Sequence, residues 1–130
     1  MIKDFGKVDR PELLNPLVLA YIGDAVYEVY VRTFIINDGA IKTNELHKMA
    51  STKFVSAKSQ AGILDKLLDS LSEEELNIVR RGRNAHSNTI PKNADIADYK
   101  KATAFEALIG YLFLNGENER WEEIVKIALS

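Results

Sequence analysis

Two long apolar segments, each interrupted by one acidic residue, most constrain how this chain folds. Asp24 is the only charged residue in segment 13–27, and Glu106 is the only one in segment 102–116. A carboxylate held against apolar neighbours costs on the order of several kcal/mol unless a positive charge compensates it. Two such carboxylates on two helices can share one compensator. A hard divalent cation, which prefers oxygen ligands, is the natural candidate.

Length and composition limit the class of protein. A chain of 130 residues predicts one domain, able to bury a core without disulfides or structural metals. The absence of cysteine excludes disulfides and thiolate metal sites, but not a carboxylate site. The first seven residues lack the apolar core of a signal peptide, and no charge-free apolar run reaches the ~18 residues of a membrane span. We therefore expect a cytoplasmic protein.

The charge is unevenly distributed along the chain. The whole chain has a net charge of -2, but segment 78–101 contains six basic and two acidic residues and carries +4. A local basic stretch on an acidic protein suits a polyanionic partner. The alternative is a solvated helix face followed by a loop.

The pattern predicts an all-α fold, because apolar residues recur at helical spacing and no strand alternation is present. Asn15 and Pro16 predict an N-cap and first helical residue, and Ser72 to Glu75 predict a capping box. Asn115 and Gly116 predict a helix stop. We expect helices over residues 16–37, from residue 43 onward, over 51–68, from 73 to a point between 82 and 85, over 96–114 and around 121–128. We expect a loop at 84–93.

The first of these helices is apolar on more than one side. Val18 and Val29 predict one apolar side, while Leu17 and Tyr21 lie on the side that also carries Asp24. A helix that is apolar on both sides is buried on both sides, either in the core or against a second subunit.

Each lone acid has a glycine nearby in its helix. Gly23 precedes Asp24, and Gly110 follows Glu106 by four residues. A glycine inside a helix destabilises it by about 1 kcal/mol relative to alanine, so close helix–helix contact is the plain explanation for both. Glu28 shares the face of Asp24, where it either assists Asp24 or reaches solvent.

Two motifs resemble those of a known family. Residues 22–26, Ile-Gly-Asp-Ala-Val, resemble the core of the ribonuclease III signature, and residues 105–113 resemble the second catalytic helix of that family. The resemblance covers nearly the whole chain and is nearest to the compact Mini-ribonuclease III subfamily. It implies a ribonuclease III endonuclease-domain-like helical bundle, with a single catalytic domain over residues 1–130 and no double-stranded-RNA-binding domain.

The resemblance also implies site residues. Asp24 and Glu106 match family acids that ligate Mg²⁺ and serve in catalysis. The other family acids are replaced by Leu17, Ala20 and Thr103, so two matched carboxylates remain where larger relatives have up to four. The Thr103 hydroxyl either orients a water at the metal or packs within its helix.

Finally, the resemblance implies a magnesium-dependent homodimeric endonuclease that cuts double-stranded RNA to 5′-phosphate and 3′-hydroxyl ends. The expected substrate is the precursor of large-subunit (23S) ribosomal RNA, and a ribosomal protein is a candidate partner. A competing class is a non-catalytic helical dimer that binds structured RNA or a ribosomal protein and uses Asp24 and Glu106 as buried ion-pair residues. His86 is either an RNA contact or an ordinary loop histidine. The candidate RNA-binding residues are Arg80, Arg81, Arg83, Asn84, His86, Lys100 and Lys101.

Overall fold

The fold is a bundle of helices, and the described residues contain no strand, which confirms the all-α prediction. The computed structural model describes residues 8–37, 54–86, 92 and 95–130. The helices are η1 (Pro11–Leu13), α1 (Pro16–Asn37), α3 (Ala57–Leu67), η3 (Leu68–Ser70), α4 (Glu73–Asn84), α5 (Ile96–Leu114) and α6 (Asn118–Ala128).

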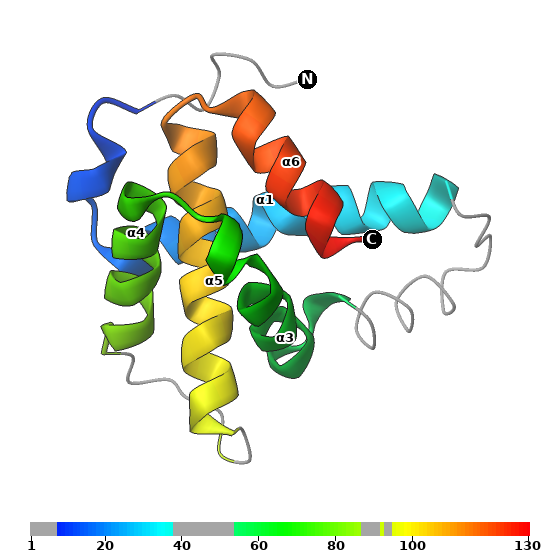
Figure 1. The fold of residues 1–130 in the computed structure, drawn as a ribbon, viewed down its shortest axis with the longest axis horizontal. Coiled ribbons are helices and arrows are strands. Elements are labelled where there is room, and N and C mark those ends of the chain that lie inside the picture. Colours follow the sequence, from blue (N-terminus) through cyan, green and yellow to red (C-terminus); the bar gives the residue numbers. More distant parts are fainter. Residues whose placement is uncertain (1–7, 38–53, 87–91, 93–94) are drawn as a thin grey trace.

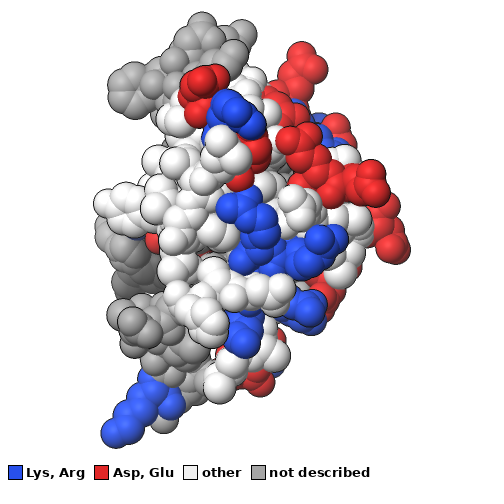
Figure 2. Space-filling view, turned by 90° about the vertical axis from the view of Figure 1, so that its left-hand side faces the viewer, with Lys and Arg blue, Asp and Glu red and all other residues white. Residues whose placement is uncertain are grey.

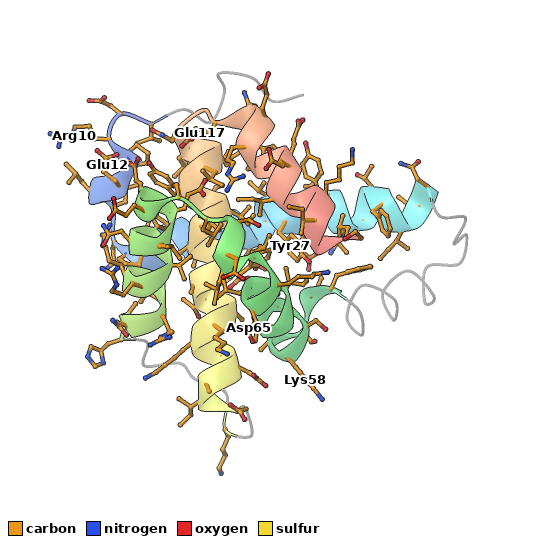
Figure 3. All side chains as sticks on the ribbon, viewed as in Figure 1. Arg10, Glu12, Tyr27, Lys58, Asp65 and Glu117 are labelled. Carbon is orange, nitrogen blue, oxygen red and sulfur yellow. The ribbon has the colours of Figure 1, made fainter. Side chains whose placement is uncertain are left out.

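Helix α5 forms the centre of the bundle, and the other helices pack around it (Figure 1). From Ala102 to Leu114 every residue of α5 is buried except Glu106, which is partly buried. Helix α1 crosses α5, while α3 and α4 flank it on opposite sides. The Tyr27 ring of α1, labelled in Figure 3, meets the Phe105 ring of α5 edge-on at a centroid distance of 4.9 Å. The two apolar segments therefore form the central crossing.

Two glycines allow the backbones of α1 and α5 to touch at this crossing. A Cβ atom on Gly23 would overlap the backbone carbonyl oxygen of Glu106, and one on Gly110 would overlap that of Leu19. The predicted close helix–helix contact is confirmed at both positions. Because Gly23 touches Glu106 directly, the same contact places the neighbouring Asp24 beside Glu106.

The helix boundaries follow the sequence signals, except that α3 begins at Ala57 instead of near residue 51, because the Ser56 side chain caps it. The Asn15 side chain accepts a hydrogen bond from Leu17 N at 2.8 Å, and Ser72 and Glu75 form both bonds of a capping box. Gly116 ends α5 with a φ of 73°, a conformation that favours glycine. The predicted helix from Thr43 and most of the predicted loop at 84–93 lie outside the described residues.

The chain before α1 is held against the end of the bundle where α5 stops. Val8 N donates to Leu114 O at 2.8 Å. The Arg81 guanidinium of α4 donates to the carbonyl oxygens of Glu12 at 2.6 Å and Leu14 at 2.9 Å. Arg10, Glu12 and Glu117 lie at this end in Figure 3.

Candidate active site

Asp24 and Glu106 lie together where α1 crosses α5. Their carboxyl groups interact directly through a side-chain hydrogen bond. Asp24 is exposed in this chain and Glu106 is only partly buried, so the pair opens to solvent on the Asp24 side. Two acids 82 positions apart in the sequence are therefore brought to one spot.

No positive group of the described residues contributes to the pKa of Glu106. Burial raises the pKa of Glu106 to about 9, and the hydrogen bond and negative charge of Asp24 contribute to the same rise. The one opposing effect on this pKa is a neutral contact with the side chain of Gln60. Without a cation, Glu106 thus keeps its proton at neutral pH.

Glu75 is a buried acid with a structural role, and its surroundings differ from those of Glu106. Glu75 is buried, and Arg120 donates to its two carboxylate oxygens at 2.7 and 2.8 Å. Arg120 lowers the pKa of Glu75 through these hydrogen bonds, so Glu75 stays ionised. No arginine or lysine of the described residues is among the groups that set the pKa of Glu106, so its carboxyl either keeps a proton or is compensated by a bound cation.

Gln60 was not identified from the sequence, yet it is the third side chain at the site. It lies on α3 with 2% of its surface exposed, and its amide approaches the Glu106 carboxyl. Its Nε2 atom completes no hydrogen bond with any described residue. The sequence gives only a weak indication of a role for Gln60: this polar residue occupies the apolar face of α3, three and four residues before Ile63 and Leu64.

The two candidate assisting residues already have partners. Arg32 Nε donates to the Glu28 carboxylate at 2.8 Å, one turn along α1. The Thr103 hydroxyl is buried and donates to the carbonyl oxygen of Tyr99 at 3.0 Å. The first contact favours a surface ion pair for Glu28, and the second favours the packing alternative for Thr103.

The candidate RNA-binding residues divide into exposed and engaged groups. Lys and Arg side chains gather across the face that α4 presents, while Asp and Glu lie toward the upper right of the same view (Figure 2). Arg81 is bonded to the chain before α1, and Lys101 Nζ pairs with the Asp65 carboxylate at 3.0 Å. The exposed candidates are Arg80, Arg83, Asn84, His86 and Lys100.

The site holds fewer acids than a closed metal site would. Among the described residues, no group of three or more His, Cys, Asp or Glu side chains is arranged to hold a metal ion. Oxygen-only donors nevertheless match the preference of Mg²⁺, which is usually held by one or two carboxylates with waters and substrate phosphates. The lack of a described basic partner for Glu106 fits a site that exchanges its proton for the same cation.

None of the described helices combines the length and the apolar character that a membrane span needs.

Comparison with known proteins identifies the class. The ribonuclease III domain family matches residues 17–117. The crystal structure of protein FN1578 from Fusobacterium nucleatum superposes with a TM-score of 0.80 at 33% identity, covering 90% of this chain and 93% of that one. The chain therefore belongs to the ribonuclease III family and is an endoribonuclease.

Its nearer similarity is to one compact group within that family. The chain is 58% identical to the Mini-ribonuclease 3 of Brevibacillus brevis over 92% of its own length and 89% of that protein. It is 48% identical to the Mini-ribonuclease 3 of Clostridium tetani over 98% of its own length and 84% of that protein. The resemblance drawn from residues 22–26 and 105–113 is thereby confirmed.

Proposed function

We propose that this protein is a magnesium-dependent endonuclease that cleaves double-stranded RNA at the Asp24–Glu106 pair. The observation that carries the proposal is the position of these two carboxyls. They meet in space and share a hydrogen bond, and no basic residue in the described part of the chain contributes to the pKa of Glu106. A pair built for stability alone would have an arginine, as Glu75 has Arg120.

Asp24 and Glu106 would be the residues that hold Mg²⁺. When bound, Mg²⁺ supplies an activated water and neutralises charge on the phosphate and the leaving oxygen. The protein contributes two fixed carboxylates on two rigid helices whose backbones touch, and this fixes their relative position. With two protein ligands, RNA phosphates and waters complete the coordination, so occupancy rises when substrate is bound.

The exposed basic residues would position the duplex. Arg80 and Arg83 lie on α4, and Lys100 lies on the part of α5 that leads to Glu106. Such residues contact phosphates, which sets the register of a duplex without reading its sequence. A-form RNA is recognised mainly by its shape, its phosphates and its 2′-hydroxyls, so a patch without base readout is sufficient. Asn84 and His86 extend this surface as 2′-hydroxyl or phosphate partners.

A homodimer would bury the apolar residues that α1 leaves exposed. Val18, Tyr21 and Val29 keep 50%, 83% and 46% of their surface exposed; Val18 and Val29 share one side of the helix, and Tyr21 lies between that side and Asp24. A contiguous apolar face on a helix favours burial against a partner, and a second copy brings the same stripe. Because Asp24 lies beside this stripe, the dimer would hold two active sites near each other, one for each strand.

The expected substrate is the precursor of large-subunit (23S) ribosomal RNA, cut in the cytoplasm to 5′-phosphate and 3′-hydroxyl ends during ribosome biogenesis. This proposal rests on the resemblance to the Mini-ribonuclease III subfamily. A ribosomal protein that presents the RNA is a candidate partner.

The test is cleavage of a duplex RNA with and without Mg²⁺, together with the variant Asp24→Asn. We expect cutting only with Mg²⁺, a fall of at least about 100-fold in rate for Asp24→Asn, and unchanged binding of the duplex. The matched control is Asp69→Asn, the same chemical change at an exposed aspartate of η3, which should cut normally. Intact RNA with the wild-type protein and Mg²⁺, despite tight binding, would favour the non-catalytic helical dimer.

A further inference from the structure

Gln60 is a buried polar side chain that packing alone does not explain. It is 2% exposed on α3, and its Nε2 atom is the one buried side-chain nitrogen or oxygen in the described residues without a hydrogen-bond partner. Leaving a buried donor unpaired costs about 1–3 kcal/mol. Leucine or methionine would fill this position on the apolar face of α3 without that cost.

The backbone around Gln60 is firmly placed. Ser56 caps α3, and its hydroxyl accepts a hydrogen bond from Ser59 N at 3.2 Å. The Gln60 N–H donates to the Ser56 carbonyl oxygen at 2.9 Å. Helix α3 packs against α5, so this turn holds the base of the Gln60 side chain in a fixed position relative to α5.

From that position the amide faces the carboxyl of Glu106. Its Nε2 approaches the carboxyl without completing a hydrogen bond, while that carboxyl bonds Asp24. A carboxylate with one oxygen directed at a cation beside Asp24 would have its second oxygen available to this unpaired donor.

We propose that Gln60 is a positioning residue, whose side-chain amide donates to one oxygen of Glu106 and holds the other oxygen toward Asp24 and the divalent cation. This inference rests on the proposed function. An amide suits the task because it is neutral and leaves both negative charges available to the cation. A guanidinium at the same place, such as Arg120 on Glu75, would neutralise the carboxylate instead. Groups that orient a metal ligand typically contribute 10–100-fold to metal affinity.

The experiment is calorimetric titration of Mn²⁺ into the RNA-free protein, with four proteins and one matched control side by side. They are the wild type, Gln60→Met, Gln60→Asn and Asp24→Asn. Methionine keeps the length and volume without the donor, and asparagine keeps the amide but shortens its reach. The matched control is Ser59→Ala, which removes a neutral polar group from the same turn of α3. Thermal unfolding in EDTA and duplex RNA binding in EDTA are measured for each.

We expect Gln60→Met and Gln60→Asn to weaken Mn²⁺ binding by about tenfold or more, with RNA binding in EDTA unchanged. Gln60→Met should unfold at the same or a higher temperature than the wild type, because it removes an unpaired buried donor. If Asp24→Asn abolishes Mn²⁺ binding while both Gln60 variants bind as the wild type does, the role of Gln60 is wrong and the proposed function stands. If Asp24→Asn leaves Mn²⁺ binding intact, the proposed function itself fails. A fall in stability with unchanged Mn²⁺ affinity would make Gln60 a packing residue.

Discussion

The glycine contact between α1 and α5 gives the sharpest stability prediction. In Gly23→Ala, the new Cβ would overlap the Glu106 carbonyl oxygen and lie 2.8 Å from the Glu106 carbonyl carbon and 2.8 Å from Gly110 N. Carbon atoms pack best at about 3.5–4.0 Å, and backbone atoms cannot rotate away, so the two helices must separate. Overpacking of this kind costs about 1–3 kcal/mol and sometimes more. We expect the upper end, about 3 kcal/mol.

The matched control is Gly62→Ala on α3, where an added Cβ has no atom within 4 Å. Here alanine should increase the free energy of unfolding by about 0.5–1 kcal/mol, because helix propensity is the only effect. Urea unfolding at one fixed protein concentration measures both variants. The reasoning also predicts that Gly23→Ala loses cleavage, because separated helices move Asp24 away from Glu106. A Gly23→Ala protein as stable and active as the wild type would refute the close approach of the two helices.

Three further predictions concern pH, RNA and assembly. In EDTA, the free energy of unfolding should fall by on the order of a few kcal/mol between pH 5 and 9. The pKa of Glu106 is raised from 4.5 to about 9, so between these values the folded state holds a proton that the unfolded state has lost. Glu106→Gln should remove most of this slope in urea unfolding, and an equally steep slope in the variant would contradict the assignment. The double variant Arg80→Ala, Arg83→Ala should weaken duplex binding. It should also reduce the slope of the logarithm of the binding constant against the logarithm of the salt concentration by roughly one unit for each phosphate that the protein no longer neutralises. An unchanged slope would mean that the RNA binds elsewhere on the protein. Val29→Lys should give a monomer in light scattering. The control Ile96→Lys, at an exposed apolar residue of α5, should keep the mass of the wild type. If both variants keep the mass of the wild type, the exposed apolar residues of α1 are not the interface.

Local sequence signals predicted the starts of α1 and α4 because each of these boundaries has a chemical cause at that point of the chain, whereas the start of α3 was expected about six residues too early. Asn15 and Pro16 set the start of α1, and Ser72 with Glu75 sets the start of α4. The crossing of α1 and α5 was also foreseeable, because a glycine within an apolar helix usually marks a close approach. These features depend on near neighbours or on one strong pattern.

The roles of individual polar side chains were less predictable because they depend on contacts between distant residues. Arg81 looked like part of a basic patch, yet its guanidinium bonds carbonyl oxygens nearly 70 positions away. Lys101 pairs with Asp65 on another helix. Gln60 gave almost no signal, because a single glutamine on an apolar face does not reveal which side chain it meets. The patch variants therefore use Arg80 and Arg83, whose substitution leaves the chain before α1 in place.

The central claim is that Asp24 and Glu106 bind one divalent cation between α1 and α5. A crystal structure of the protein grown with Mn²⁺, using the anomalous signal of the ion, tests it most directly. The account predicts one ion bonded to a carboxylate oxygen of each residue at about 2.0–2.2 Å. An ion bound elsewhere, or the two carboxyls still hydrogen-bonded to each other at saturating Mn²⁺, would contradict it.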